Sequence, residues 1–396
     1  MKAIPYGRQS ITEEDIRAVT EVLQSDFLTQ GPKIAEFENA FAAYIGSKYA
    51  VAISNGTAAL HLAALALDVK EGDKVITTPI TFAASGNCIK YCGGDVVFAD
   101  IDPATYLIDI RSVETLLASS PKGTYKGIIP VDLAGRAVNM EPFRKLADEY
   151  GCWIIEDACH APGGYFTDSK GDPQWCGNGN FAELSIFSFH PVKHIACGEG
   201  GMITTNNEEL YQRLLVLRTH GITRNTDSFV NTKEWAAGNA VTPEGYPGWY
   251  MEMQELGYNY RLTDFQAALG ISQLKKAEKG LARRREIAKN YADAFQGKPW
   301  LKGQSGYDES HAYHLYIIEV ADRLGLYNYL RKKNIFAQVH YIPMHLMPYY
   351  KNQGHTEGEL PHAETYYSRC LSLPMFPTLT ETEQQYVIDS ICAYYA

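Results

Sequence analysis

The chain has 396 residues, of which 45% are hydrophobic and 21% are charged, and its formal net charge is 36 − 46 = −10. This is the composition of an ordinary globular protein, and it excludes a disordered chain, a collagen-like repeat and a small disulfide scaffold. The acidic balance argues against a general basic face, so no nucleic-acid partner is expected.

The cysteines and the hydrophobic stretches indicate the cellular compartment of the protein. Eight cysteines are scattered along the chain without a C-x-x-C pair, which is typical of free thiols in a reducing compartment. The first residues contain no apolar segment of the signal-peptide kind. The longest apolar stretch, residues 58–67, contains His61 and is too short to cross a bilayer. We therefore expect a cytoplasmic protein without a membrane partner.

The first two thirds of the chain alternate between helical and strand patterns. Thr12 and Asp15 match a capping box ahead of a helix, and a second amphipathic helix follows over residues 34–44. Helical patterns, such as residues 141–150, separate several of the short apolar runs that we interpret as buried strands. These runs are residues 74–78, 96–101, 127–132, 152–156, 184–189 and 201–205. The alternation predicts an α/β sheet with helices on both faces and ligands at the carboxyl ends of its strands.

The rest of the chain has a different organisation. Residues 222–250 are polar and rich in Gly and Pro, which indicates a long surface loop. The following segments are predicted as helical patterns over 263–295, turns over 297–310, a strand over 311–320, a helix over 324–333, a strand over 337–341 and a final helix over 381–394. We therefore predict a large domain over residues 1–276, whose N-terminal residues also reach the substrate site, and a small C-terminal α+β domain over 277–396.

Several common motifs are absent or incomplete. The first strand is not followed by G-x-G-x-x-G, and the chain has no G-x-x-x-x-G-K-[ST], so the phosphate loops of nicotinamide-dependent and P-loop enzymes are missing. His190 and His194 have the spacing of a zinc helix, but they lack its Glu, and Pro191 argues against a helix there. We predict no metal site.

Four segments carry candidate chemistry. Residues 54–60 form a small-residue turn that leads into a helix, whose N-terminus would suit a phosphate group. Asp157 ends a hydrophobic strand, where it could pair with a cation. Lys193 follows another strand, and a desolvated lysine can form a Schiff base. Residues 259–261 hold Asn and Arg ahead of a helix, where they could meet phosphate or carboxylate groups. Taken singly, each segment also fits a plain cap, a loop start, a surface lysine or a capping turn.

Together, the order of these segments resembles that of the fold-type I pyridoxal 5′-phosphate (PLP) enzymes, which have a large α/β/α sheet domain and a small C-terminal α+β domain. The longer strings are similar to those of the DegT/StrS sugar-nucleotide aminotransferases over nearly the whole chain. They are Ser54-Asn-Gly-Thr57, Thr78-Pro-Ile-Thr81-Phe82, Glu156-Asp157, Ser188-Phe-His-Pro-Val-Lys193, Gly198-Glu-Gly-Gly201 and Gly257-Tyr-Asn-Tyr-Arg261.

A closer subgroup is suggested by Leu28-Thr-Gln-Gly31, Lys193-His194 and Ala337-Gln-Val-His-Tyr341. These segments resemble the UDP-4-amino-4,6-dideoxy-N-acetyl-β-L-altrosamine transaminases of pseudaminic acid biosynthesis. The resemblance implies transfer of an amino group from L-glutamate, which becomes 2-oxoglutarate, to C4 of a UDP-linked 4-keto-6-deoxy-sugar.

The resemblance also implies a role for each matching position. Lys193 would bind PLP as a Schiff base and move the proton, and Asp157 would pair with the pyridinium nitrogen, because a protonated ring is the better electron sink. The other expected cofactor contacts are Gly56, Thr57, Ala58, Phe82, His160, Ser188 and Asn259. Asn259 would act in the neighbouring subunit, which implies a homodimer with shared active sites. The expected substrate contacts are Tyr6, Asp26, Phe27, Leu28, Thr29, Arg261, Val339, His340, Tyr341 and Ile342.

Three alternatives stay open at this stage. The substrate could be another 4-keto sugar linked to dTDP or GDP. A PLP-dependent sugar dehydratase is disfavoured, because those members of the group carry His in place of the Schiff-base lysine. A non-catalytic regulator on the same fold is disfavoured by the intact Lys193 and Asp157.

Overall fold

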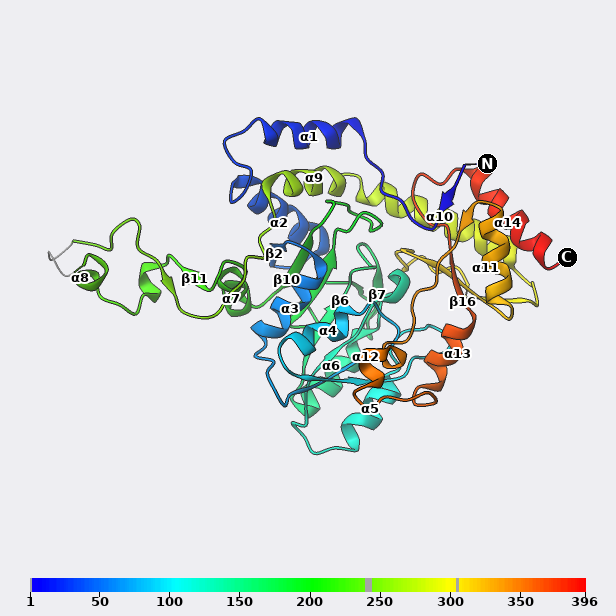
Figure 1. The fold of residues 1–396 in the computed structure, drawn as a ribbon, viewed down its shortest axis with the longest axis horizontal. Coiled ribbons are helices and arrows are strands. Elements are labelled where there is room, and N and C mark those ends of the chain that lie inside the picture. The colour runs from blue at the N-terminus through cyan, green and yellow to red at the C-terminus, as the bar shows by residue number, and fades with distance from the viewer. Residues whose placement is uncertain (1, 239–243, 304–305) are drawn as a thin grey trace.

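The centre of the computed structural model, which describes residues 2–238, 244–303 and 306–396, is a seven-stranded sheet (Figure 1). Its strand order is β2-β10-β9-β6-β5-β3-β4. The strand β10 is antiparallel to both of its neighbours, and all the other pairs are parallel. The strands are β2 (Tyr49–Ile53), β3 (Lys74–Thr77), β4 (Asp95–Phe98), β5 (Tyr125–Ile129), β6 (Trp153–Asp157), β9 (Leu184–Ser188) and β10 (Gly201–Thr205).

Burial on both faces explains why these segments read as apolar runs. All five residues of β10 and four of the five in β2 are buried, as expected for a sheet covered by helices on either side. The sequence analysis located every strand of this sheet except β2. That strand contains two alanines, which favour strands weakly, and it pairs with β10, which follows some 150 residues later in the chain.

Fourteen α-helices lie in the described residues, and none of them is both long and apolar enough to cross a membrane. At the first helix, Asp15 accepts the Thr12 N–H at 2.8 Å, which confirms the capping box. The helical patterns predicted over residues 263–295 form two helices, of which the first packs against α1 and the second enters another core (Figure 1). The helices are α1 (Glu13–Leu23), α2 (Pro32–Ile45), α3 (Gly56–Ala66), α4 (Ala84–Tyr91), α5 (Ile110–Ala118), α6 (Met140–Tyr150), α7 (Glu208–Arg218), α8 (Lys233–Ala236), α9 (Asp264–Leu274), α10 (Ala277–Phe295), α11 (Arg323–Lys332), α12 (Pro348–Lys351), α13 (Pro361–Arg369) and α14 (Glu381–Tyr394).

A second hydrophobic core lies at the C-terminal end of the chain, where α10, α11 and α14 pack on a small antiparallel sheet. This sheet consists of β13 (Leu301–Gly303), β14 (Tyr316–Val320) and β16 (Cys370–Leu373). Ile4, only 1% exposed, belongs to the same core, because β1 (Ile4–Pro5) pairs in parallel with β15 (Ile335–Phe336). The N-terminus therefore packs with the C-terminal part of the chain. The domain boundary at residue 276 stays a prediction.

Two predicted strands of this C-terminal part differ from the structure. The strand expected over residues 311–320 is regular only from Tyr316 onward. The prediction of a strand over residues 337–341 is wrong, because only Gln338 forms an isolated bridge, to Ser372. The chain turns there into the wall of a cavity instead of continuing along the sheet.

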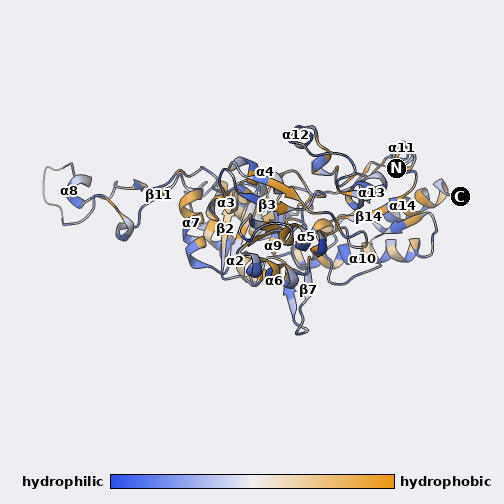
Figure 2. Cartoon of the chain, turned by 90° about the horizontal axis from the view of Figure 1, so that it is seen from below, coloured by the Kyte–Doolittle hydropathy of each residue, from blue (hydrophilic) through white to orange (hydrophobic). Residues whose placement is uncertain are grey.

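Residues 222–238 and 244–253 form an arm that extends from the body of the molecule beyond α7 (Figures 1 and 2). The predicted loop contains short elements: β11 (Ile222–Thr223) pairs with β12 (Glu252–Met253), and α8 lies farther out. Large apolar side chains are open to solvent on this arm, with Val230 82% and Trp249 76% exposed. Residues 239–243 lie outside the described part of the chain. A separate hairpin is formed by β7 (Tyr165–Thr167) and β8 (Pro173–Trp175).

Candidate active site

A cavity of about 930 Å³ opens at the carboxyl ends of the central strands, where ligands bind in sheets of this type. It brings together residues that are up to 341 positions apart, from Tyr6 to Met347. Thirteen of the predicted site residues line it: Tyr6, Gly56, Thr57, Ala58, Phe82, Asp157, His160, Ser188, Lys193, Val339, His340, Tyr341 and Ile342. This is the size that small-molecule and cofactor sites commonly have.

One end of the cavity is built by the N-terminus of α3. Its Asn55 cap accepts the Ala58 N–H at 2.8 Å, while the N–H groups of the first turn have no acceptor within the helix. A Cβ atom at Gly56 would lie 3.0 Å from the Cβ of Ser188, so glycine lets this helix approach the end of β9 closely. The helix dipole and the Ser188 hydroxyl make this end suitable for a phosphate group.

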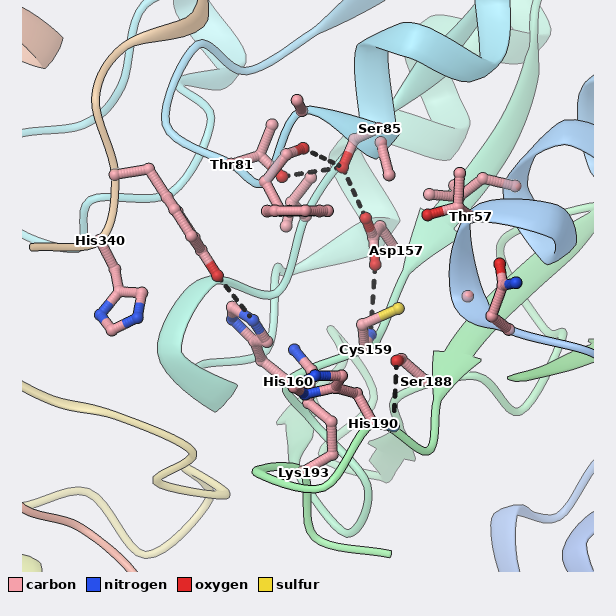
Figure 3. Close-up of a pocket in the computed structure, with 18 of the residues that line it drawn as sticks. Thr57, Thr81, Ser85, Asp157, Cys159, His160, Ser188, His190, Lys193 and His340 are labelled. Atoms are coloured by element: carbon pink, nitrogen blue, oxygen red, sulfur yellow. Dashed lines mark hydrogen bonds between the residues drawn. The ribbon is translucent and has the colours of Figure 1, made fainter. Parts of the chain in front are cut away.

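Asp157 enters the cavity from the end of β6, and two donors hold its carboxylate (Figure 3). Its Oδ2 accepts the Ser85 hydroxyl at 2.7 Å, and its Oδ1 accepts the Cys159 N–H at 3.2 Å. The Ser85 hydroxyl is itself 2.8 Å from that of Thr81. These contacts fix the orientation of the carboxylate toward the space that a cationic ring nitrogen would occupy.

Lys193 reaches the cavity from a turn after β9, where its N–H donates to the His190 carbonyl at 2.9 Å. Burial lowers the pKa of the Lys193 amine, while the neighbouring Cys159 and Asp157 act in the opposite direction. A lysine with a lowered pKa has more of its neutral form, which is the form that attacks a carbonyl carbon.

These residues fit PLP. The start of α3 and Ser188 would hold its phosphate, Asp157 its ring nitrogen and Lys193 its aldehyde carbon. Phe82, although it lines the cavity, is 61% exposed, so a face of its ring is open for stacking. When bound, PLP supplies an electron sink for the carbanion that forms at the substrate carbon.

The sequence analysis did not identify Ser85 and His314 as site residues. Ser85 lies four positions after Thr81 on the start of α4, and its spacing gave no signal of the contact with Asp157. His314 is 4% exposed, and its ring centre lies 4.3 Å from that of His160. Its only sequence signal is its place just before β14, and its position beside His160 comes from tertiary packing.

The remaining predicted site residues lie outside this cavity. Asp26, Phe27, Leu28, Thr29 and Asn259 are exposed, and Arg261 lines a second, smaller hollow of about 250 Å³ together with Gln30 and Gly31. The two segments are neighbours, because Thr29 bridges to Thr263 and the Leu28 carbonyl accepts the Asp264 N–H at 3.0 Å. The predicted residues therefore form two separate groups on one chain.

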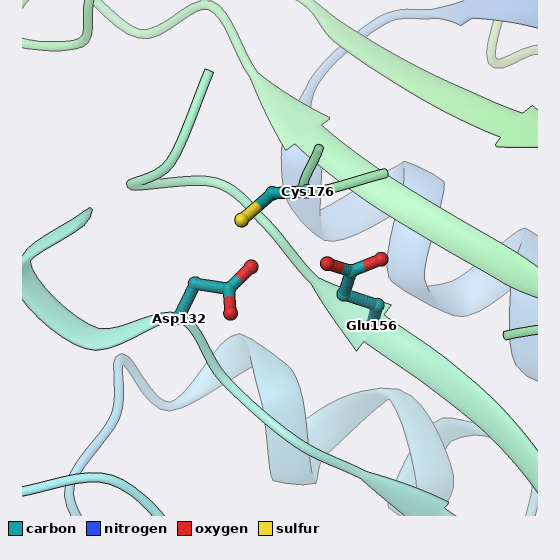
Figure 4. A group of neighbouring side chains, drawn as sticks. All are labelled: Asp132, Glu156 and Cys176. Carbon is teal, nitrogen blue, oxygen red and sulfur yellow. The ribbon is translucent and has the colours of Figure 1, made fainter. Parts of the chain in front are cut away.

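One position before Asp157, Glu156 belongs to a buried cluster with Asp132 and Cys176 (Figure 4). One oxygen or sulfur atom of each residue lies within 4.8 Å of the others. Glu156 Oε2 accepts the Gly177 N–H and the Ser185 hydroxyl, both at 2.9 Å. Burial raises the pKa of both carboxyl groups, and the proximity of Glu156 raises that of Asp132 further. Since two adjacent carboxylates cannot both ionise in a dry interior, we interpret them as a pair that keeps one proton. The prediction of no metal site stays a prediction.

Replacing Glu156 by Gln should make stability less sensitive to rising pH. The unfolded chain releases these protons above the ordinary pKa values of 3.8 and 4.5, whereas the folded pair keeps one. The free energy of unfolding therefore falls as pH rises from these ordinary values toward the raised pKa of the folded pair. The fall is about 1.4 kcal/mol per pH unit for one proton. The amide of Glu156→Gln can donate to Asp132 at every pH, so the decline should shrink.

Urea unfolding of the holoenzyme across a pH series measures this effect. The exposed Glu286, replaced by Gln, is the matched control and should behave as the wild type. An equally steep decline in Glu156→Gln and in the wild type would contradict the shared proton.

Known proteins resemble this chain over almost its full length. Residues 9–392 match the model of the DegT/DnrJ/EryC1/StrS aminotransferase family. The spore coat polysaccharide biosynthesis protein SpsC of Bacillus subtilis is 38% identical over 397 residues, which are 98% of this chain and 96% of SpsC. Helicobacter pylori PseC, an aminotransferase involved in the biosynthesis of pseudoaminic acid, has a TM-score of 0.85 and 30% identity, with 99% of each chain covered. The PLP form of Spr1654 from Streptococcus pneumoniae has a TM-score of 0.85 and 28% identity, covering 98% of this chain and 97% of Spr1654.

Proposed function

Because this chain belongs to the DegT/DnrJ/EryC1/StrS aminotransferase family, whose sugar aminotransferases use PLP, we propose a specific reaction for it. The enzyme transfers the amino group of L-glutamate to C4 of a UDP-linked 4-keto-6-deoxy-N-acetylhexosamine. The products are 2-oxoglutarate and the UDP-4-amino-sugar. This is the reaction of a UDP-4-amino-4,6-dideoxy-N-acetyl-β-L-altrosamine transaminase in pseudaminic acid biosynthesis, and we expect it to take place in the cytoplasm.

The observation that carries the proposal is the convergence of three features in one cavity: Lys193, Asp157 and the N-terminus of α3. Each of the three has an ordinary structural explanation when it stands alone. Together they supply an amine, a counter-ion for a ring nitrogen and a phosphate site, which is the set that PLP chemistry needs. Lys193 would remove the proton from the amino-donor carbon in the first half-reaction, and in the second it would deliver a proton to the sugar carbon that receives the amino group.

The likeness to PseC, an aminotransferase involved in the biosynthesis of pseudoaminic acid, supports the pathway in this proposal. The UDP-linked sugar rests on the resemblance of residues 28–31, 193–194 and 337–341. A dTDP- or GDP-linked 4-keto sugar is the second candidate, since the resemblance to DegT/StrS enzymes covers several nucleotide sugars. Lys193 argues against a sugar dehydratase and against a non-catalytic regulator.

A panel of UDP-, dTDP- and GDP-linked 4-keto-6-deoxy sugars, each assayed with glutamate for 2-oxoglutarate and amino-sugar, tests the substrate. We expect turnover with the UDP sugar and a kcat/KM at least about tenfold lower with the others, because each lost nucleotide contact costs on the order of 1.4 kcal/mol. Reaction with only dTDP or GDP sugars would refute the pseudaminic assignment. Deoxygenated sugar without amino transfer would instead favour the dehydratase.

We further propose that two copies of the chain share their active sites. The split of the predicted residues into two groups supports this, because Asn259 and Arg261 do not line the chain's own cavity, although Tyr260 between them does. Arg261 instead lines the second hollow, next to the 26–29 segment. The exposed apolar side chains of the arm over residues 222–238 and 244–253 are of the kind that a second subunit would cover.

If two subunits share their active sites, two inactive variants should complement each other in a mixed dimer. Lys193→Ala and the double variant Asn259→Ala/Arg261→Ala should each be inactive alone. When co-expressed, they should recover up to about a quarter of wild-type activity, since half of the random dimers are mixed and each mixed dimer has one intact site of two. Lys193→Ala co-expressed with Asp157→Ala is the matched control and should recover none, because both residues line one chain's cavity. Recovery in neither mixture would contradict shared sites.

A further inference from the structure

One wall of the cavity carries a histidine whose ring is bonded to a buried serine. His340 lines the cavity and is only 7% exposed. Its Nδ1 lies 2.9 Å from the hydroxyl of Ser372, which belongs to β16. His340 lies across the pocket from Thr57, with Asp157 between them (Figure 3). Since Thr57 marks the phosphate end, His340 is on the side where a substrate would approach the cofactor.

The hydroxyl of Ser372 has one acceptor within the described part of the chain, which is the ring of His340. Ser372 is 1% exposed and does not line the cavity, so its O–H cannot reach a ligand there. Its backbone is fixed by a pair of hydrogen bonds with Gln338, at 3.1 and 2.7 Å. A buried O–H without an acceptor is costly. The hydroxyl therefore donates to Nδ1 of His340.

This bond determines which nitrogen of His340 carries the proton. Burial, and to a lesser extent the nearby Lys193, lower the pKa of His340 to about 3, so the ring is neutral. A neutral imidazole that accepts at Nδ1 carries its proton on Nε2. No described residue bonds to this Nε2, and the atom is not buried, so it reaches the surface of the cavity. The wall thus presents an N–H donor that is available to a ligand.

The backbone of His340 is held as well as its ring. Its carbonyl accepts the hydroxyl of Tyr366 at 2.6 Å, and Tyr366 is 2% exposed on α13. The start of α13 is held by Asp100, whose carboxylate accepts the N–H groups of His362 and Ala363 at 3.0 and 2.9 Å. The donor is therefore kept at one place on the wall, which is the condition for recognising an acceptor oxygen by its position.

We propose that Ser372 is a positioning residue for the sugar half-reaction. By donating to Nδ1, it fixes the tautomer of His340 whose Nε2–H donates to an acceptor oxygen of the nucleotide sugar. This inference deepens the proposed function and rests on it for the class of substrate. It does not depend on which nucleotide the sugar carries.

Nuclear magnetic resonance of the ¹⁵N-histidine-labelled resting holoenzyme at neutral pH locates the ring proton. The wild-type signals of His340, identified by their loss in His340→Phe, should be those of an unprotonated Nδ1 and a protonated Nε2. In Ser372→Ala the other tautomer should also appear, because Nδ1 has lost its donor. Ser390→Ala is the matched control, since Ser390 is a buried serine on α14 that does not line the cavity.

The control should keep the wild-type signals. A protonated Nδ1 or a charged ring in the wild type would overturn the proposal, and this reading needs no stable Ser372 variant. An unchanged tautomer in Ser372→Ala would equally overturn it, because the serine would then not select the tautomer.

Separate half-reactions identify the ligand, because glutamate also presents acceptor oxygens. The rate at which glutamate alone converts the visible band of the holoenzyme should be the same in Ser372→Ala and in the wild type. With the keto-sugar that the substrate panel selects, the concentration giving half of the maximal rate should rise about fivefold, the effect of losing one hydrogen bond from an uncharged donor. An equal change in the glutamate half-reaction, or no change in either, would contradict the proposal.

A double-mutant comparison shows whether Ser372 acts through His340. His340→Phe should raise the same sugar concentration, and Ser372→Ala should add nothing in that background. A full effect of Ser372→Ala in His340→Phe would refute the positioning role, since it would reflect a general loosening of β16. A wild-type enzyme without any glutamate half-reaction would instead refute the proposed function, while the resting-state tautomer would still test the contact with Ser372.

Discussion

Lys193→Ala should abolish turnover and remove the visible absorption of the lysine-bound cofactor. The amine nitrogen is the only atom of this side chain that can bond to PLP, and its lowered pKa increases the fraction in the neutral form that this bond requires. The same amine transfers the proton between carbons, a task that alone contributes about 10²- to 10⁴-fold in enzymes. We therefore expect at least about a 10³-fold loss of kcat.

Spectra and a glutamate-to-2-oxoglutarate assay measure both effects. Lys145→Ala is a suitable control, because this lysine side chain is 74% exposed on α6. Glutamate-dependent transamination that persisted in Lys193→Ala would refute the role of this residue.

Asp157→Asn should lower kcat by about 10²- to 10³-fold while the cofactor stays bound. The amide can still accept the Ser85 hydroxyl, which donates at 2.7 Å in the wild type, so the shape of the site is kept. The variant loses the negative charge that pairs with the ring nitrogen. Loss of one partner of a buried ion pair costs about 3–5 kcal/mol. Each 1.4 kcal/mol of this cost that is felt in the transition state lowers the rate about tenfold.

The spectrum distinguishes this variant from Lys193→Ala, since visible absorption should remain when Lys193 is intact. Ser85→Ala should show a smaller loss, because it removes one contact that orients the carboxylate and leaves its charge. Unchanged kcat in Asp157→Asn would show that the carboxylate does not support the chemistry.

Much of the fold could be predicted because the central strands are buried on both faces and therefore read as apolar runs. The family resemblance and PLP as the cofactor are confirmed by the match over residues 9–392 and by the PLP-form neighbour. The strand β2 was missed because its packing partner lies far away in the chain.

Within the site, the residues that lie in a recognisable local motif could be predicted from the sequence. Lys193, Asp157 and the start of α3 each lie at the end of a strand or the beginning of a helix, and local pattern is enough to place them at one edge of a parallel sheet. Their residue types then limit the chemistry to an amine, a carboxylate and a phosphate site.

The orientation of those residues, and the side chains that complete the cavity, depend on the tertiary structure. Tyr6 meets His340, with 5.1 Å between ring centres, because β1 pairs with β15. Likewise, Tyr341 meets His160 across 181 positions. Such contacts depend on how two cores pack against each other, and a hydrogen-bond partner far away in the chain leaves no periodic trace in the sequence.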